Sequence, residues 1–202
     1  MHRSGSYAGS GAAAGELPLA SLAPVGPGRK NDYAASPMRA APEILLQQDG
    51  VGVARCGPVF FTIFYAPPTV ERLEALVGVQ RRVMTREKHA IVSLIDPGVG
   101  KEMKHDARKR AAAISAEMDQ HTVSQALIVL GKGFVGATVR SVIAGIQMWS
   151  GPQHPWKVVS ETETGLVWTI EQLRAVGKDA DLPSLRVCAS LLFDATIHKG
   201  PA

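Results

Sequence analysis

The pattern of apolar residues becomes regular after residue 50 and alternates between the repeat of a strand and that of a helix. Two runs rich in β-branched and aromatic residues, 51–56 and 59–65, flank a glycine–proline pair and predict a β-hairpin. Residues 68–87 then carry apolar side chains at near-helical spacing, with charged residues between them. Thr69 stands near the start of this stretch and is the predicted N-cap of the helix.

Strand and helix patterns alternate through most of the remaining chain. The predicted elements are, in order, a buried strand over 90–96, a helix over 102–119, a strand over 126–130, a helix over 134–149, a strand over 156–160 and a helix over 163–176. This order predicts an α/β sandwich in which an N-terminal β-hairpin is followed by repeating βα units on a small mixed sheet.

The two ends of the chain differ from this regular part. Residues 1–42 are rich in Gly, Ala, Ser and Pro and show no sustained period, so we expect a disordered leader. Met38 stands just before the first patterned segment, and a gene start placed too early is a second hypothesis for the leader. The expected domain spans 43–177, and residues 178–202 fit either a last helix or a loosely docked tail.

The composition argues against several classes of protein. The formal net charge is +4, and acidic residues interrupt the basic run 101–110, which is typical of a solvated helix face rather than a nucleic-acid interface. No apolar run approaches the roughly 18 residues that cross a membrane. The N-terminus also lacks the apolar core of a signal peptide. We therefore expect a cytoplasmic protein with neither a membrane span nor a nucleic-acid partner.

The cysteines and histidines do not form a pattern that indicates a metal site. Cys56 and Cys188, the two cysteines, lie far apart and outside any C-x-x-C pair, which is typical of a reducing compartment without disulfides. The six histidines do not cluster at metal-ligand spacing, and we expect surface or capping roles for them. The sequence predicts no metal ligand, no cofactor and no catalytic residue.

One glycine-rich turn has the spacing of a phosphate-binding loop. Gly131, Gly133 and Gly136 lie between a predicted strand and helix, where backbone amides and the helix N-terminus suit a pyrophosphate. This is the third βα unit, however, whereas the dinucleotide fingerprint opens the first, and too little chain follows for a full dinucleotide fold. The glycines are therefore predicted to form a tight corner. A nucleotide- or dinucleotide-binding enzyme that uses this turn is the alternative function.

Three local features accompany the predicted order of elements. They are Ile95-Asp96 at a strand end, Trp149 near the close of the 134–149 helix, and the corner over 149–155. Together they resemble STAS-type domains, the fold of bacterial anti-sigma-factor antagonists, and particularly their divergent relatives of unknown function. The resemblance covers residues 51 to about 175. It implies a STAS-like sandwich that acts as a regulatory or protein-interaction module without catalysis.

The chain departs from that family at the residue after the aspartate. The antagonists carry a phosphorylatable Ser or Thr there, whereas Pro97 and Gly98 follow Asp96 in this chain, so control by phosphorylation is not expected. Open α/β sheets bind their ligands at the carboxyl ends of the strands. We expect the partner to be another protein, with a small-molecule ligand as an alternative. The candidate interaction residues are Asp96, Pro97, Gly98, Lys101, Gly131 and Lys132.

Overall fold

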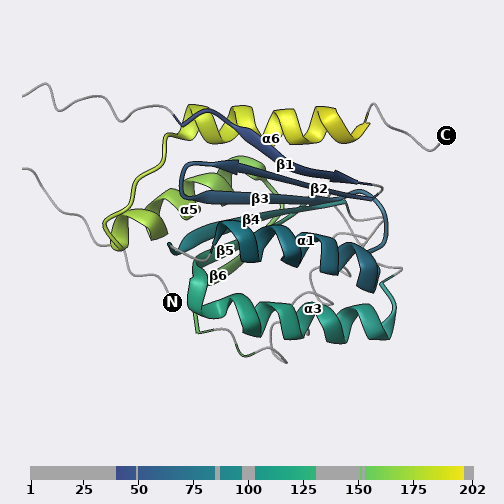
Figure 1. Cartoon of the computed structure of the whole chain (residues 1–202). Coiled ribbons are helices and arrows are strands. Elements are labelled where there is room, and N and C mark those ends of the chain that lie inside the picture. The colour runs from purple at the N-terminus through teal and green to yellow at the C-terminus, as the bar shows by residue number, and fades with distance from the viewer. Residues whose placement is uncertain are drawn as a thin grey trace, which may run out of the picture. The chain divides into compact units, whose positions relative to one another are not determined.

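The computed structural model of the chain describes residues 40–48, 50–84, 87–96, 103–130, 151 and 153–197 (Figure 1). Its strands are β1 (Glu43–Gln48), β2 (Val51–Cys56), β3 (Val59–Phe64), β4 (His89–Ile95), β5 (Thr122–Val129) and β6 (Trp156–Val159). Its helices are α1 (Val70–Val83), α3 (His105–Met118), the short 3-10 helix η1 (Asp119–His121), α5 (Thr162–Ala175) and α6 (Leu182–Ile197). These elements all belong to one compact unit, Ala35–Ala202.

The strands form one mixed six-stranded sheet in the order β1-β2-β3-β4-β5-β6. The first three pair antiparallel, and β3 through β6 pair parallel. The prediction of an α/β fold with a mixed sheet is therefore confirmed, and the predicted hairpin is β2 with β3. β1 was not predicted, and it turns the hairpin into a three-stranded meander at one edge of the sheet.

Helices cover both faces of the sheet, with α1 and α3 on one face and α5 and α6 on the other (Figure 1). Successive strand residues point to opposite faces. Phe60 therefore packs in the core beneath α1 and α3, while Phe61 packs beneath α5 and α6. Every residue of β3 is buried, as expected for a strand covered on both sides.

The C-terminal segment forms a helix, one of the two structures that its sequence fits. The Asp181 carboxylate accepts a hydrogen bond from the Ser184 amide at 3.0 Å and so caps the first turn of α6. Four residues at helical spacing are buried against the sheet: Leu185, Cys188, Ala189 and Leu192. α6 lies over β2 and β3, so it is part of the core of the domain.

Several predicted boundaries agree with the structure, and two are wrong. Thr69 is the N-cap of α1, because its hydroxyl accepts a hydrogen bond from the Arg72 amide at 3.3 Å. α1 ends at Val83, short of the predicted end. The strand predicted over 126–130 begins four residues earlier, at Thr122, where polar residues are buried in the sheet. The predicted helix over 134–149 and the leader up to residue 39 lie outside the described residues.

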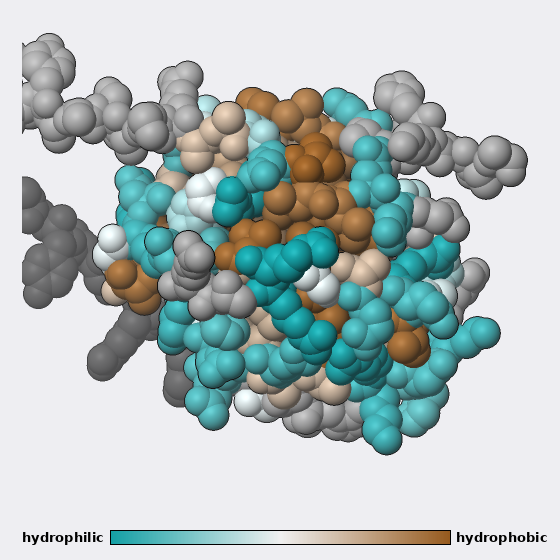
Figure 2. Space-filling model, in the orientation of Figure 1, coloured by the Kyte–Doolittle hydropathy of each residue, from teal (hydrophilic) through white to brown (hydrophobic). Residues whose placement is uncertain are grey.

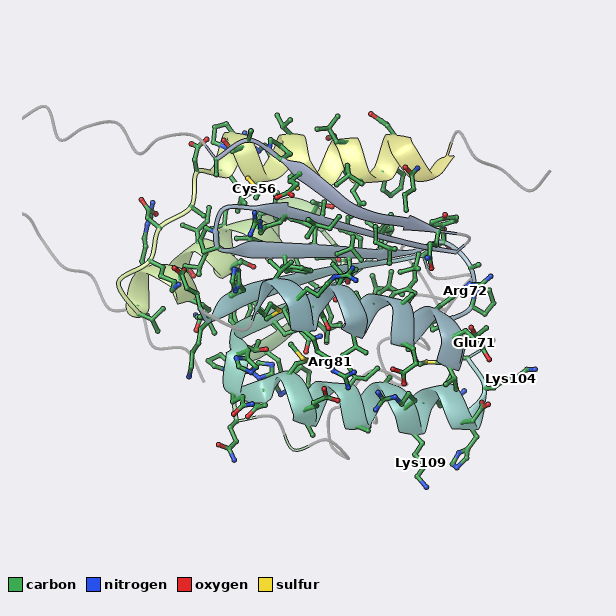
Figure 3. All side chains as sticks on the ribbon, viewed as in Figure 1. Cys56, Glu71, Arg72, Arg81, Lys104 and Lys109 are labelled. Carbon is green, nitrogen blue, oxygen red and sulfur yellow. The ribbon has the colours of Figure 1, made fainter. Side chains whose placement is uncertain are left out.

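Two ion pairs join α1 to α3 across their exposed faces. The Arg81 guanidinium donates to the Glu117 carboxylate at 2.6 and 2.9 Å, and the Arg110 guanidinium donates to Glu74 at 2.5 Å. Lys109 points away from the domain on the outer side of α3 (Figure 3). The described part of the basic run is thus the solvated helix face that its composition predicts. None of the helices among the described residues has the length and apolar character to cross a lipid bilayer.

Candidate functional site

The predicted interaction surface is only partly within the described residues. Asp96 follows β4 at the carboxyl end of the parallel strands and is exposed. A shallow recess of about 330 Å³ lies at the carboxyl end of β6, beside Ser160 and Glu161. The other candidates, Pro97, Gly98, Lys101, Gly131 and Lys132, lie outside the described residues, as do Gly133 and Gly136. The predicted surface and the glycine turn therefore stay predictions.

A larger cleft, of about 520 Å³, opens at the opposite end of these strands. Because β4, β5 and β6 are parallel, their amino ends lie together there. The segments that enter these strands and the end of α5 together line the cleft. Its polar side chains are Glu87, Lys88, Asp119, Gln120, Thr122, Gln153, His154 and Lys178.

A buried histidine and a partly buried aspartate form one wall of the cleft. Asp119 begins η1 directly after α3, and His154 lies in the turn before β6. The Asp119 carboxylate is hydrogen-bonded to Nδ1 of His154 and also accepts the Gln153 amide at 3.0 Å. The His154 side chain is only 5% exposed. Its other ring nitrogen, Nε2, is buried and has no hydrogen-bond partner among the described residues.

The protonation state of Asp119 follows from these contacts. Burial favours the neutral acid, but the hydrogen bonds from His154 and from the Gln153 amide outweigh it and lower the pKa of the Asp119 carboxyl. An ionised carboxylate only accepts hydrogen bonds, so Nδ1 of His154 carries a proton. Nε2 is then the atom of the pair that is left to interact with a ligand.

A second ion pair crosses the cleft. Nζ of Lys178, after α5, lies 3.1 Å from Oε2 of Glu87, before β4. The hydrogen bond and the charge of Lys178 lower the pKa of Glu87. Lys88 is exposed beside this pair and has no ion-pair partner among the described residues. Because Glu87 is paired with Lys178, the ammonium group of Lys88 stays available at the cleft.

The expectation of surface or capping roles is wrong for two histidines. His154 and His89 are both buried. Nδ1 of His89 donates to the Glu87 carbonyl at 2.8 Å, and the ring packs edge-on against Phe60. Desolvation lowers the pKa of His89, which keeps the ring neutral inside the domain. This histidine therefore anchors the segment that leads into β4, next to the cleft.

The two cysteines lie in the same core cluster between the sheet and α6. Figure 3 shows Cys56 on the side of its strand that faces α6. Burial, followed by the neighbouring Cys56, raises the pKa of the Cys188 thiol from 9.0 to about 12. Burial also raises the pKa of Cys56, whose Sγ donates to the Ala40 carbonyl at 3.3 Å. Both residues are free thiols.

We expect the native thiols to resist alkylation. At about pH 8 the thiolate fraction of Cys188 is about a thousandfold below that of an ordinary cysteine, and the thiolate is the reactive form. Because the folded protein favours the neutral Cys188 thiol, this thiol contributes fully to stability below pH 9.0. The contribution is lost as the pH rises toward about 12, the pKa of the thiol in the folded protein. Intact-mass analysis after iodoacetamide treatment, with and without guanidinium chloride, measures the difference. Equal rates in the two conditions would contradict the burial.

Comparisons with protein families, with curated proteins and with solved structures found no match to the chain. The described residues also hold no group of three or more His, Cys, Asp or Glu side chains placed to bind a metal ion. The Asp119–His154 pair escaped the sequence analysis because its members lie 35 residues apart, with no local motif to link them.

Proposed function

We propose that the chain is a regulatory or protein-interaction module of STAS-like type that lacks the usual phospho-acceptor. The described order of a hairpin, α1, β4 ending before Asp96, α3, β5, β6 and α5 supports this proposal, since it agrees with the order that the resemblance implies. β1 and α6 lie outside the stretch that the resemblance covers. They also carry the surface on which the proposal rests.

The observation that carries the proposal is an apolar surface formed by α6 and β1. Val187 and Leu191 project from α6 and are 51% and 46% exposed, and Ile44 on β1 is 42% exposed. Phe193 adds a further partly exposed ring. Figure 2 shows brown, apolar atoms gathered in the region where Figure 1 draws α6 and β1. Contiguous exposed apolar surface of this kind marks a binding site for another protein. We call it the α6–β1 surface.

The position of β1 adds a second reason. β1 is the edge strand of the sheet and pairs with β2 alone among the described strands. An edge strand presents backbone groups that a further strand can pair with. Two arginines near the surface already have partners within the chain. The Arg55 guanidinium lies 2.7 Å from the Glu43 carboxylate, and Arg186 forms an ion pair with Glu163.

The occupant that these features favour is a second copy of the chain. A two-fold interface places the same patch on both sides, so the patch must tolerate itself. The α6–β1 surface is largely apolar, and Arg55 and Arg186 beside it already form ion pairs within the chain. The charge on its helix face is the exposed carboxylate of Asp194, three residues after Leu191, which an interface between two copies must leave at the solvent-exposed rim. Antiparallel pairing of the two β1 strands would join the sheets and bring the exposed faces of the α6 helices together.

We expect the protein to dimerise through this surface. Its mass in sedimentation velocity should rise from 21.4 kDa toward twice that value with increasing concentration. Leu191→Glu should weaken association at least about a hundredfold, because it buries an unpaired charge. Val167→Glu is the matched control, since Val167 is a similarly exposed residue on α5 and should leave the dimer intact.

Two results would overturn this assignment. One is a wild-type protein that stays monomeric from about 1 µM to about 1 mM, a range that spans weak and moderate affinities. The other is a dimer that Leu191→Glu and Val167→Glu affect equally. Circular dichroism of both variants checks that the introduced carboxylate has not unfolded the domain.

A further inference from the structure

We propose that the cleft at the amino ends of β4, β5 and β6 binds a neutral molecule that carries a hydroxyl group on an apolar body, and that this hydroxyl donates a hydrogen bond to Nε2 of His154. The cleft shares no residue with the α6–β1 surface, so the inference does not depend on the proposed dimer. It lies at the end of the strands opposite to the one at which the sequence predicts a ligand.

Nε2 of His154 is a buried nitrogen that no described residue satisfies. A buried polar atom without a hydrogen bond destabilises a folded protein, and native structures rarely retain one. The side chain of His154 is 5% exposed, and the residue belongs to the lining of the cleft. A ligand atom bonded to Nε2 would remove this cost, so the nitrogen indicates where in the cleft a ligand is held.

The bond between His154 and Asp119 determines which kind of group Nε2 can bind. In a neutral imidazole one ring nitrogen donates and the other accepts. Nδ1 faces the ionised carboxylate of Asp119, which only accepts, and Nδ1 therefore carries the proton. Nε2 of the neutral ring is then an acceptor, and the ligand atom that bonds to it must be a donor.

The charges of the cleft favour a donor without a charge of its own. The carboxylates and ammonium groups of the lining are equal in number: Glu87 and Asp119 against Lys88 and Lys178. An ammonium ligand would meet the charge of Lys88, which has no ion-pair partner in the described part of the chain. A carboxylate ligand has no proton to donate to Nε2. The ligand that suits both the charges and the nitrogen is neutral.

A hydroxyl is the neutral donor that suits this position best. Its hydrogen turns about the C–O bond to reach the acceptor, whereas an amide N–H is fixed in the amide plane. An amide also brings a carbonyl oxygen that needs a donor of its own when it is buried. An alcohol or a phenol therefore satisfies Nε2 with the fewest further demands on the cleft.

The rest of the lining determines the body of the ligand. Val123, Pro155 and Val176 supply apolar surface to the same cleft. Small-molecule sites combine such walls with a few polar groups that fix the orientation of the ligand, in volumes of roughly 300–1,000 Å³. The volume of this cleft, about 520 Å³, lies in that range. The part of the ligand that carries the hydroxyl is therefore apolar and contacts these three residues.

The ligand reaches Nε2 past side chains at the mouth of the cleft. Gln120 and Gln153 are exposed and line the cleft beside Asp119 and His154. Exposed side chains change rotamer on picosecond to nanosecond timescales. Movement of these glutamines therefore uncovers the nitrogen without a rearrangement of the backbone.

The test is an NMR titration of the full chain, labelled with nitrogen-15, with phenol and with anisole, its methyl ether, which has no donor. Before any ligand is added, Nδ1 of His154 should be protonated and Nε2 unprotonated at about pH 8, above the range in which histidine ordinarily titrates. Phenol should then shift the Nε2 resonance of His154 in a saturable way. It should also shift the amides of Val123 and Val176, which line the cleft and give the affinity in every variant.

His154→Asn removes Nε2 but keeps the bond to Asp119, because the amide nitrogen of Asn occupies the position of Nδ1 and can donate in its place. The ratio of the affinities for phenol and anisole should be at least about tenfold larger in the wild type than in this variant, because one hydrogen bond to a buried group is lost. If the variant does not fold, the response of Nε2 in the wild type still decides.

Two further variants are controls. His105→Asn makes the same change at an exposed position on α3 and should leave the ratio as it is in the wild type. Lys88→Gln should also leave it unchanged, since a neutral ligand does not need the ammonium group.

Four results would overturn the proposal. The first is the absence of a saturable response to phenol in the folded wild-type protein. The second is a proton on Nε2 of His154, which would make this nitrogen a donor. The third is the same ratio of phenol to anisole affinity in the wild type and in folded His154→Asn. The fourth is benzoate or benzylammonium that binds the same residues more tightly than phenol, which would change the class of ligand.

Discussion

Leu192→Ala is expected to lower the free energy of unfolding by about 3 kcal/mol or more, in the range measured for fully buried leucines. Leu192 is completely buried on the face of α6 that packs on the sheet, in the same cluster as Phe61 of β3. Truncation removes most of the side chain and leaves a cavity between the helix and the sheet. Urea unfolding followed by circular dichroism measures the loss.

Leu191→Ala is the control for this prediction. The two leucines are neighbours on α6 and have the same helix propensity, but Leu191 faces outward. At about 1 µM, where self-association adds little to stability, Leu191→Ala should change the unfolding free energy by less than about 1 kcal/mol. Equal losses in the two variants would mean that α6 does not pack on the sheet through Leu192.

Gly50→Ala is expected to be nearly as destabilising, with a loss of about 2–4 kcal/mol from backbone strain and overpacking together. Gly50 joins β1 to β2 with φ of +82°, a conformation that suits glycine. An added Cβ would lie 2.5 Å from Nε of Arg72 and 2.8 Å from Cβ of Ala66. Arg72 cannot move without cost, because its Nη1 donates to the Pro67 carbonyl at 2.7 Å.

Gly177→Ala separates the two contributions. Gly177 follows α5 with φ of +73°, but a Cβ there would meet no atom within 4 Å. This substitution should therefore show only the backbone strain, about 1–2 kcal/mol. Chemical denaturation of both variants gives the difference. If Gly50→Ala is no worse than Gly177→Ala, the crowding around Arg72 does not affect stability.

Much of the fold was predictable because most elements carry a clear period of their own. The stretch of α5, for example, places Leu166, Ile170 and Leu173 on one face, and all three are buried in the structure. The beginning of β5 was not predictable in this way. Thr122 is polar, yet it is buried because its hydroxyl donates to the Met118 carbonyl at 2.9 Å. A hydrogen bond of this kind has no signature in composition.

β1 and α6 were harder to predict from the sequence for a related reason. β1 has adjacent leucines instead of an alternating pattern, so its strand signal is weak. α6 has a buried stripe at helical spacing, but the exposed Val187 and Leu191 blur that stripe. The same exposed residues that obscure the helix in the sequence make the α6–β1 surface. A cap signal, Asp181 followed by Ser184, was present at the start of α6 and favours the helix.

The candidate cleft could not be predicted, because its residues come from four separate segments. Asp119 and His154 meet only when the parallel strands bring the end of α3 beside the turn that enters β6. The sequence predicts a functional surface at the carboxyl ends of the strands instead, where Asp96 is exposed. That surface stays a prediction, and the cleft lies at the other end of the same strands.

Hydrogen exchange of the β1 amides at increasing protein concentration tests the central claim, that the α6–β1 surface binds another copy, most directly. The outward-facing amides of β1 should exchange at least about tenfold more slowly once the dimer dominates, because exchange then requires the strand pair to open. The amides of β6, at the other edge of the sheet, should be unaffected. Exchange of β1 that is the same at every concentration would contradict the account.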